Sequence, residues 1–295
     1  MAEQKIEFRK VRDFGENLSD TFLFIRQNFL PLIKSFFAIC GVFMIGYAIF
    51  NGIYQSRAFS IFDELRKGGI IGQRNGFENI FTPEYFLMIF LGFLFYVSMR
   101  VVLGAFIKFY VENNNTAPTI EQVWNIFIKY FFKVLIFSIP IFLLILAGTL
   151  FCVAPGIWLL VVLMPFDLIL IIEEASFESA FLRSFTLIRE NFWISLAIYF
   201  VAALIYSFSS GIIGIIVGVI VAAATFISTN NIGTTAGIAT SFLLVVSRVF
   251  YIIFFVSAAL HYYNLVERHD GTGIMQRVEN MGNDQNNFDN IQENY

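Results

Sequence analysis

Charged residues are scarce in this sequence, and that scarcity excludes a water-soluble domain. Lysine, arginine, aspartate and glutamate make up 14% of the 295 residues, whereas hydrophobic residues make up 58%. Soluble domains carry about 25% charged residues, because their surfaces must be hydrated. The formal net charge of −3 also gives no indication of a basic surface for nucleic acid. We therefore expect a protein that dissolves in the lipid bilayer.

Cysteine and histidine are also rare, which excludes most metal centres and disulfide frameworks. Cys40 and Cys152 each lie within an apolar run, whereas His261 and His269 lie at the edge of the last apolar run and just beyond it. A zinc site or a disulfide scaffold needs more ligands that can reach one another. We interpret the cysteines as small apolar residues and the histidines as interfacial or tail residues. No metal and no cofactor is expected.

Long apolar runs, by contrast, are abundant. A membrane-spanning helix needs about 20 mostly apolar residues, and six such segments are present, with the break between the last two near 228–233. The segments lie near 29–54, 83–110, 134–152, 157–172, 193–221 and 235–262. The sequence therefore predicts an all-α integral membrane protein with six transmembrane helices in a domain of residues 29–266. Residues 1–28 form an N-terminal cytoplasmic segment, and residues 267–295 form a polar, disordered tail.

Local signals mark several helix ends. Thr82 is a candidate N-cap for the second span, and Thr119 with Gln122 fits a capping box before the third. The dipeptide Pro155-Gly156 predicts the turn between the third and fourth spans.

Small residues and prolines also occur inside the spans. Gly211, Gly214 and Gly218 are spaced so that a neighbouring helix could pack closely on the fifth span. Pro140 and Pro165 are expected to kink the third and fourth spans.

Basic residues fall mainly on one side of this topology. With six spans, both termini and the loops after the second and fourth spans share a side, which receives thirteen lysines and arginines against four on the other side. The thirteen are Lys5, Arg9, Lys10, Arg12, Arg26, Lys34, Lys108, Lys129, Lys133, Arg183, Arg189, Arg268 and Arg277. Because cytoplasmic loops carry an excess of lysine and arginine, we expect a multi-pass protein of the bacterial inner membrane with both termini in the cytoplasm.

A repeated sequence precedes the first and fifth spans. Residues 22–29 (FLFIRQNF) reappear as residues 185–192 (FTLIRENF), and apolar residues continue upstream at steps of three and four, as on one face of a helix. A weaker copy, residues 128–132, precedes the third span. The pattern predicts three helical hairpins, each preceded by a cytoplasmic amphipathic helix that lies in the membrane interface.

Four basic side chains near the ends of these interfacial segments are candidate contacts to lipid headgroups or to a partner protein. They are Arg26, Lys129, Arg183 and Arg189. A basic head at the entry to the bilayer can reach the phosphates. The alternative is plain anchoring of the helices and control of topology, without a specific ligand.

Residues 154–193 carry a family resemblance. Their pattern consists of Pro155, Gly156, Trp158, Ala180, Arg183, Ser184, Asn191, Phe192 and Trp193. It resembles a superfamily of bacterial six-helix membrane proteins that includes the membrane domain attached to some glycerophosphodiester phosphodiesterases and several stand-alone families of unknown function. The sequence from residue 264 onward is similar to the tails of Bacteroidota homologues. Those phosphodiesterases carry a separate soluble catalytic domain, for which this chain has neither the length nor the acidic and histidine content. The resemblance therefore implies a membrane module without the enzyme.

Three ionisable residues, Arg100, Asp167 and Arg248, lie inside the predicted spans. Each costs about 2.5–3.5 kcal/mol at the centre of a membrane helix, so such residues normally face the bundle interior and pair. Asp167 is the only acid that could offset either arginine. One interpretation is a polar inner pathway or an anionic-ligand site, and the other is a buried ion pair that fixes helix packing.

No catalytic constellation is recognisable, so no catalytic residue is proposed from the sequence and the chain is not expected to be an enzyme. The expected function is a non-enzymatic scaffold, assembly or partner-binding module of the membrane. The expected partners are the lipid bilayer and other membrane or cytoplasmic proteins. The alternative is a small-molecule or ion transporter or channel built on the intramembrane charges.

Overall fold

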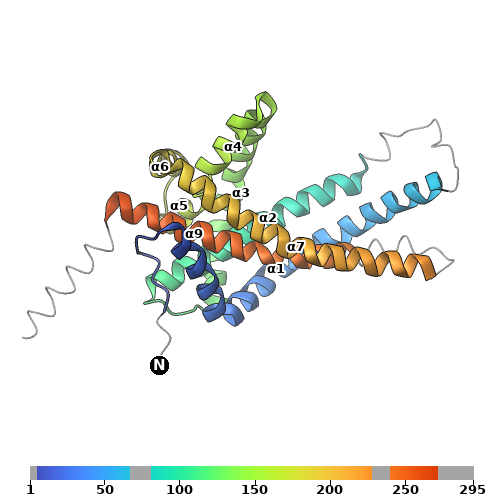
Figure 1. Cartoon of the computed structure of the whole chain (residues 1–295), viewed down its shortest axis with the longest axis horizontal. Coiled ribbons are helices and arrows are strands. Elements are labelled where there is room, and N and C mark those ends of the chain that lie inside the picture. The colour runs from blue at the N-terminus through green and yellow to red at the C-terminus, as the bar shows by residue number, and fades with distance from the viewer. Residues whose placement is uncertain (1–4, 67–80, 228–239, 272–295) are drawn as a thin grey trace, which may run out of the picture.

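The computed structural model describes residues 5–66, 81–227 and 240–271, and within these ranges the regular structure is entirely helical. Figure 1 shows the elements in chain order. They are α1 (Phe14–Arg66), α2 (Pro83–Glu112), α3 (Ile120–Phe151), α4 (Val153–Val162), α5 (Phe166–Ile172), α6 (Phe177–Arg189), α7 (Phe192–Ile227), the 3-10 helix η1 (Ser247–Phe250) and α9 (Tyr251–Asp270).

Within the described residues, six helical segments are long and apolar enough to cross a membrane. They are Phe14–Arg57, Pro83–Glu112, Ile120–Phe151, Val153–Ile172, Phe192–Ile220 and Thr240–Asp270. The prediction of an all-helical, multi-pass membrane protein is thereby confirmed. The expected break near 228–233, the start of the sixth predicted span at 235 and the predicted tail beyond residue 271 lie outside the described residues.

The capping signals identify two helix starts correctly. The Thr82 side chain accepts a hydrogen bond from the Tyr85 amide at the start of α2. At the start of α3, Thr119 and Gln122 form a reciprocal capping box, in which the Thr119 amide donates to Gln122 Oε1 at 2.8 Å. Each cap satisfies amide groups that have no partner inside the helix.

A break at Asn28 divides α1. Its backbone angles, φ −115° and ψ 16°, are not helical, and its side-chain amide donates to the Phe24 carbonyl at 3.0 Å. Pro31 follows in the first turn after the break, where its missing N–H would have no helical partner in any case. The sequence around Asn28 therefore fits a change of helix direction.

The fourth predicted span is made of two helices. Pro165 lies between the two helices: α4 ends at Val162, and α5 begins at Phe166. The α3–α4 turn lies at Cys152, where the backbone is extended, and not at Pro155-Gly156 as expected from the sequence. Pro155 instead occupies the first turn of α4, where proline is tolerated.

Consecutive membrane-spanning helices contact each other, for example α1 with α2, α3 with α4, and α7 with α9. α2 also contacts α3, α5 and α9, and most of its residues between Phe95 and Tyr110 are buried. In Figure 1, α1, α2, α7 and α9 follow the long axis of the molecule, whereas α3 and α4 project away from it. The core therefore forms around the second half of α2.

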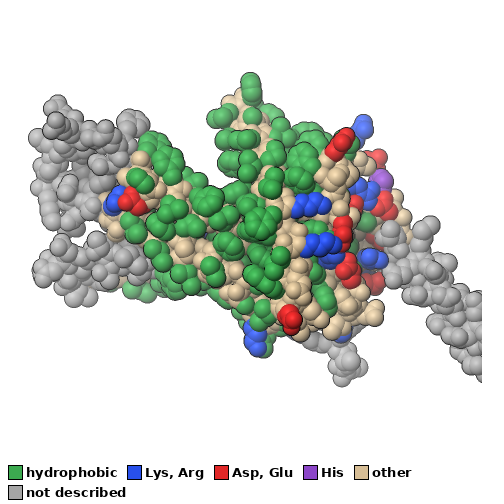
Figure 2. Space-filling view, turned by 180° about the vertical axis from the view of Figure 1, so that it is seen from behind, with side chains coloured by type: hydrophobic (Ala, Val, Ile, Leu, Met, Phe, Trp, Pro, Cys, Tyr) green, Lys and Arg blue, Asp and Glu red, His purple; other side chains and the backbone are tan. Residues whose placement is uncertain are grey.

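Large apolar side chains cover the outer surface of the helices. Figure 2 shows hydrophobic side chains over most of one face and the larger group of charged side chains at one end, with a smaller charged group at the opposite end. Phe151 is 91% exposed, Phe208 is 70% exposed and Ile215 is 69% exposed. Such a surface would aggregate in water but is compatible with lipid chains.

The glycines of α7 do not pack as expected. Among the described residues, nothing lies within 4 Å of a Cβ placed on Gly211 or Gly218, and only a Leu244 methyl approaches Gly214, at 3.6 Å. Close backbone contact occurs instead between α3 and α4. A Cβ on Gly156 would lie 2.2 Å from Thr149 Oγ1 and 2.8 Å from Thr149 Cα.

Replacing Gly156 by alanine should therefore lower the free energy of unfolding. The new methyl group would press on the backbone of α3, and overpacking of this kind costs about 1–3 kcal/mol. Thermal unfolding of the purified protein in detergent measures the effect. Gly218→Ala is the matched control, because its Cβ meets open space and alanine favours helix. A Gly156→Ala protein as stable as wild type would contradict the close α3–α4 contact.

Candidate functional site

Two of the three intramembrane charges form a buried ion pair. Arg100 on α2 and Asp167 on α5 approach to 2.7 Å between Nε and Oδ2, with side chains 12% and 2% exposed. A guanidinium cannot lose its proton at accessible pH, so a carboxylate is the group that offsets its charge at this depth. The Arg100 guanidinium also lies over the Tyr96 ring, 5.4 Å from its centroid.

Arg248, the third charge, lies apart from this pair. It belongs to η1 and its side chain is exposed. It donates from Nη1 to the Tyr206 hydroxyl at 2.9 Å. Within the described part of the chain, no carboxylate forms an ion pair with it. The sequence therefore identified three residues of which the structure brings only two into contact.

Three tyrosine rings connect the two arginines. Tyr251 lies 5.9 Å from Tyr96 and 5.9 Å from Tyr206 between ring centroids, and these two flanking tyrosines contact Arg100 and Arg248 respectively. The arrangement forms an aromatic layer between α2, α7 and α9.

A cavity of about 440 Å³ lies beside this layer. Its lining consists of Tyr47, Met88, Ile89, Gly92, Phe95, Tyr96, Met99, Tyr206, Arg248 and Tyr251. Most of these side chains are apolar or aromatic, and Arg248 is the one charged group among them. Arg100 and Asp167 do not line the cavity.

Charged residues at one end of the molecule hold several segments together. This charged end consists of residues 5–20, 108–112, 129–133 and 173–191 and the last turn of α9. Lys108 on α2 donates to Glu174 Oε1 at 2.8 Å and to the Ile171 carbonyl at 2.9 Å. Lys129 on α3 lies 3.1 Å from the same carboxylate, and Lys133 donates to the Ala175 carbonyl at 2.7 Å. The α5–α6 connection is thereby fixed to α2 and α3.

A second ion cluster joins α6 to α9. The Arg183 guanidinium contacts Glu173 at 3.5 Å and the carboxylate of Asp270. The Tyr262 hydroxyl donates to Glu173 at 2.7 Å. Burial is the largest single influence on the pKa of Arg183 and lowers it, but the neighbouring carboxylates of Asp270 and Glu173 together outweigh burial, so the pKa lies above its ordinary value.

The four candidate headgroup or partner contacts therefore differ in their surroundings. Lys129 and Arg183 take part in the internal ion pairs just described, whereas Arg26 and Arg189 have exposed side chains. Arg189 lines a cleft of about 740 Å³ between α4, α6 and the end of α9, together with Trp158, Leu182 and other side chains.

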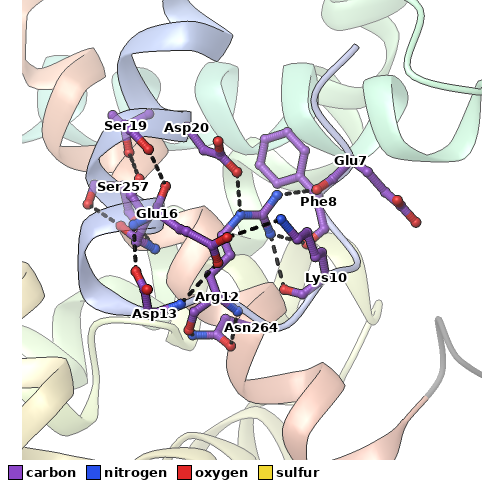
Figure 3. A network of polar contacts seen from close by, with 12 residues as sticks. Glu7, Phe8, Lys10, Arg12, Asp13, Glu16, Ser19, Asp20, Ser257 and Asn264 are labelled. Carbon is purple, nitrogen blue, oxygen red and sulfur yellow. Dashed lines mark hydrogen bonds and ion pairs between the residues drawn. The ribbon is translucent and has the colours of Figure 1, made fainter. Parts of the chain in front are cut away.

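Arg12 anchors the N-terminal segment, and nothing in the sequence distinguished it from other basic residues. Its side chain is 1% exposed, and its Nε donates to Asp20 at 2.8 Å. The other guanidinium nitrogens donate to the backbone carbonyls of Glu7, Phe8 and Lys10. Figure 3 shows these contacts surrounding the guanidinium.

The backbone of Arg12 is bound by the end of α9. Its amide donates to Asn264 Oδ1 at 3.0 Å, and its carbonyl accepts from Asn264 Nδ2 at 3.1 Å. Arg268 donates to the same carbonyl at 3.0 Å. The first and last described segments are thus joined through a buried contact (Figure 3).

His261 is not an interfacial residue, as the sequence suggested, but a core residue. It is fully buried, and its Nε2 lies 2.8 Å from the Ser195 hydroxyl. The ring of Tyr199 packs against it at 5.5 Å. Residues 5–66, 81–227 and 240–271 contain no group of three or more His, Cys, Asp or Glu side chains suited to a metal ion.

Comparison with protein-family models, with curated proteins and with solved structures found no match. The resemblance of residues 154–193 to bacterial six-helix membrane proteins therefore stays a prediction.

Removing one partner of the buried pair should be costly. Asp167→Asn leaves the Arg100 charge uncompensated, and such changes cost about 3–5 kcal/mol. Arg57→Gln is the matched control: it breaks an arginine–carboxylate pair with Glu84 between α1 and α2 that is 48% and 31% exposed, where about 0–1 kcal/mol is expected. Thermal or denaturant unfolding in detergent measures both.

The double variant Arg100→Gln/Asp167→Asn separates the interaction between these two side chains from the individual effect of each substitution on stability. It removes both charges of this pair, so its loss of stability should be smaller than the sum of the two single losses. Strictly additive losses would show that the two side chains do not interact.

Glu174 should make stability depend on acid pH. The hydrogen bond from Lys108, with further ones from Tyr130 and Lys129, lowers the pKa of Glu174 from 4.5 to about 2. A carboxylate whose pKa falls on folding stabilises the folded state above its ordinary pKa, and this contribution is lost as the pH falls from 4.5 to about 2. Glu174→Gln should therefore be less stable than wild type at pH 7, and the difference should shrink towards pH 2. Equal differences at both pH values would argue against the Lys108 contact.

Proposed function

We propose that this chain is a non-enzymatic scaffold of the bacterial inner membrane that binds a partner protein at its charged end. The observation that carries the proposal is the construction of that end. Segments far apart in the sequence are fixed to one another through the buried Arg12 and through Glu174. A surface built from several immobilised segments can present a defined shape to a partner without a large ordering cost.

The charged end faces the cytoplasm in this proposal. It carries the first and last described segments of the chain, and the basic residues of the sequence favour that side by thirteen to four. Excess lysine and arginine determine which loops stay in the cytoplasm. The grouping of charged side chains at one end in Figure 2 supports this orientation.

The membrane part is proposed to be three repeated hairpins, each introduced by an interfacial helix. The backbone leaves the helical path at Asn28 in α1, and Glu190 and Asn191 separate α6 from α7. These two asparagines occupy the same position in the repeated sequences 22–29 and 185–192. On α6, the rings of Phe177, Phe181 and Phe185 lie in line at 6.1 and 4.8 Å. This apolar face packs against the hydrophobic core, so the proposed place of α6 at the interface rests on the sequence pattern.

The cleft of about 740 Å³ at the charged end is the proposed partner contact. Leu182 and Trp158 are 58% and 44% exposed in its wall, and the exposed Arg189 lies at its rim. This combination suits a protein segment with an apolar anchor next to an acidic residue, because aromatic anchors and arginine dominate binding energy at interfaces.

Site-specific photocrosslinking in living cells tests the proposal. A photoreactive amino acid at Leu182 should give an adduct of one defined mass, and Arg189→Glu should abolish it by charge reversal. The matched control position is Phe208, which is 70% exposed on α7 and should meet lipid only. No discrete adduct at position 182, or the same adduct at position 208, would contradict a partner site at the charged end.

Transport of a small anion is the second candidate function. The observation that favours it is the cavity beside Arg248. Arg248 lies within the sixth span. A transporter would move a radiolabelled anion into proteoliposomes, and Arg248→Gln would abolish the flux. A scaffold would show no flux in either protein.

A further inference from the structure

Arg248 places a permanent positive charge inside the membrane. It lies eight residues into the span that begins at Thr240, which corresponds to about 12 Å along a helix. Asp167, an acid buried within the fourth span, pairs with Arg100 at 2.7 Å. Tyr206, the hydrogen-bond partner of Arg248, carries no charge. A permanent guanidinium at this depth therefore lacks a counter-anion among the described residues.

The helix geometry changes at Arg248. The sixth span changes from α-helix to the 3-10 helix Ser247–Phe250 at this point. The Ser247 hydroxyl donates to the Leu244 carbonyl at 2.7 Å and lies 2.9 Å from the Ser210 hydroxyl on α7. Departures from regular helix at membrane depth occur where the backbone is buried or lines a cavity.

The cavity next to Arg248 has apolar walls, and tyrosine side chains and the Arg248 guanidinium also line it. Met88, Ile89 and Met99 of α2 form part of the walls. Tyr251 is 7% exposed, and apart from its contact with Tyr96 its buried hydroxyl has no hydrogen-bond partner of good geometry in the described part of the chain. The volume of about 440 Å³ falls in the range of small-molecule sites.

The position of the cavity indicates how a ligand would enter. Met88, Ile89 and Gly92 belong to the first turns of α2, at the end opposite the charged end (Figure 1). Ile89 is 48% exposed although it lines the cavity. The opening therefore lies on the lipid-facing surface, and a ligand that partitions into the bilayer can reach it sideways.

We propose that this cavity binds an anionic amphiphile, with a carboxylate or phosphate head on Arg248 and an acyl chain along the apolar wall of α2. A guanidinium can donate two parallel hydrogen bonds to either head. The ligand is a lipid of the membrane itself. This site is independent of the partner contact at the charged end.

Photoaffinity labelling of the full-length protein, purified in a non-ionic detergent, tests the proposal. Three probes carry the same diazirine-bearing chain: a free fatty acid, phosphatidylglycerol and zwitterionic phosphatidylcholine. Incorporation is measured by intact-protein mass spectrometry, and the labelled peptide is mapped. At least one anionic probe should label α2 near Met88–Met99 more strongly than phosphatidylcholine does. Labelling by the fatty acid alone identifies a carboxylate ligand, and labelling by phosphatidylglycerol alone identifies a phospholipid.

Two variants establish which group binds the head. Arg248→Gln should reduce anionic labelling about tenfold or more, because the loss of a hydrogen bond to a charged group weakens binding by at least that factor. Arg248→Lys should retain a substantial part of it. Lys34→Gln, which removes an exposed cation on α1 that does not line the cavity, is the matched control and should leave labelling unchanged.

A third variant covers the case in which Arg248→Gln fails to fold. Ile89→Trp keeps the charge but fills the entrance of the cavity, so it should also reduce anionic labelling. The proposal is overturned if phosphatidylcholine labels α2 as well as the anionic probes do, or if folded Arg248→Gln or Ile89→Trp protein labels like wild type.

Discussion

The ion pair between Arg100 and Asp167 is the interaction on which the interior of this membrane protein depends. It joins α2, the most central helix, to the short α5, which is buried from Phe166 to Ile171. Arginine keeps its charge in any environment the protein can offer, so α5 must present its carboxylate at this depth. Because Asp167 pairs with Arg100, it does not offset the positive charge of Arg248, which needs another counter-anion. The different surroundings of the two arginines follow from this single pairing.

The bilayer imposes the complementary arrangement on the other charges. Nearly all of them lie at the ends of the spans, where water is accessible, and at the charged end they bind segments to one another. Lys108 and Lys129 share Glu174, and Arg12 binds carbonyls of its own segment while Asn264 binds its backbone. These contacts give the loops a fixed shape that hydrophobic packing alone would not supply. The proposed scaffold function rests on that fixed shape.

The elements were more predictable from the sequence than their contacts were. Hydropathy located six spans, and cap residues such as Thr119 located helix starts, because both signals are local. The pairing of Asp167 with an arginine could be expected from the absence of another intramembrane acid, but the choice of Arg100 could not. Burial of Arg12 and His261 and the separation of Arg248 depend on which helices are neighbours and how each is rotated. A single sequence carries little information on either.

The division of roles between the two intramembrane arginines can be observed directly. A cryo-electron microscopy structure of the full-length protein, bound to an antibody fragment in nanodiscs of native lipid, would show the surroundings of both side chains. We predict elongated lipid density with its head on the Arg248 guanidinium, and Asp167 as the sole counter-ion of Arg100. An empty or water-filled cavity, or a carboxylate of Asp167 shared with Arg248, would contradict this division.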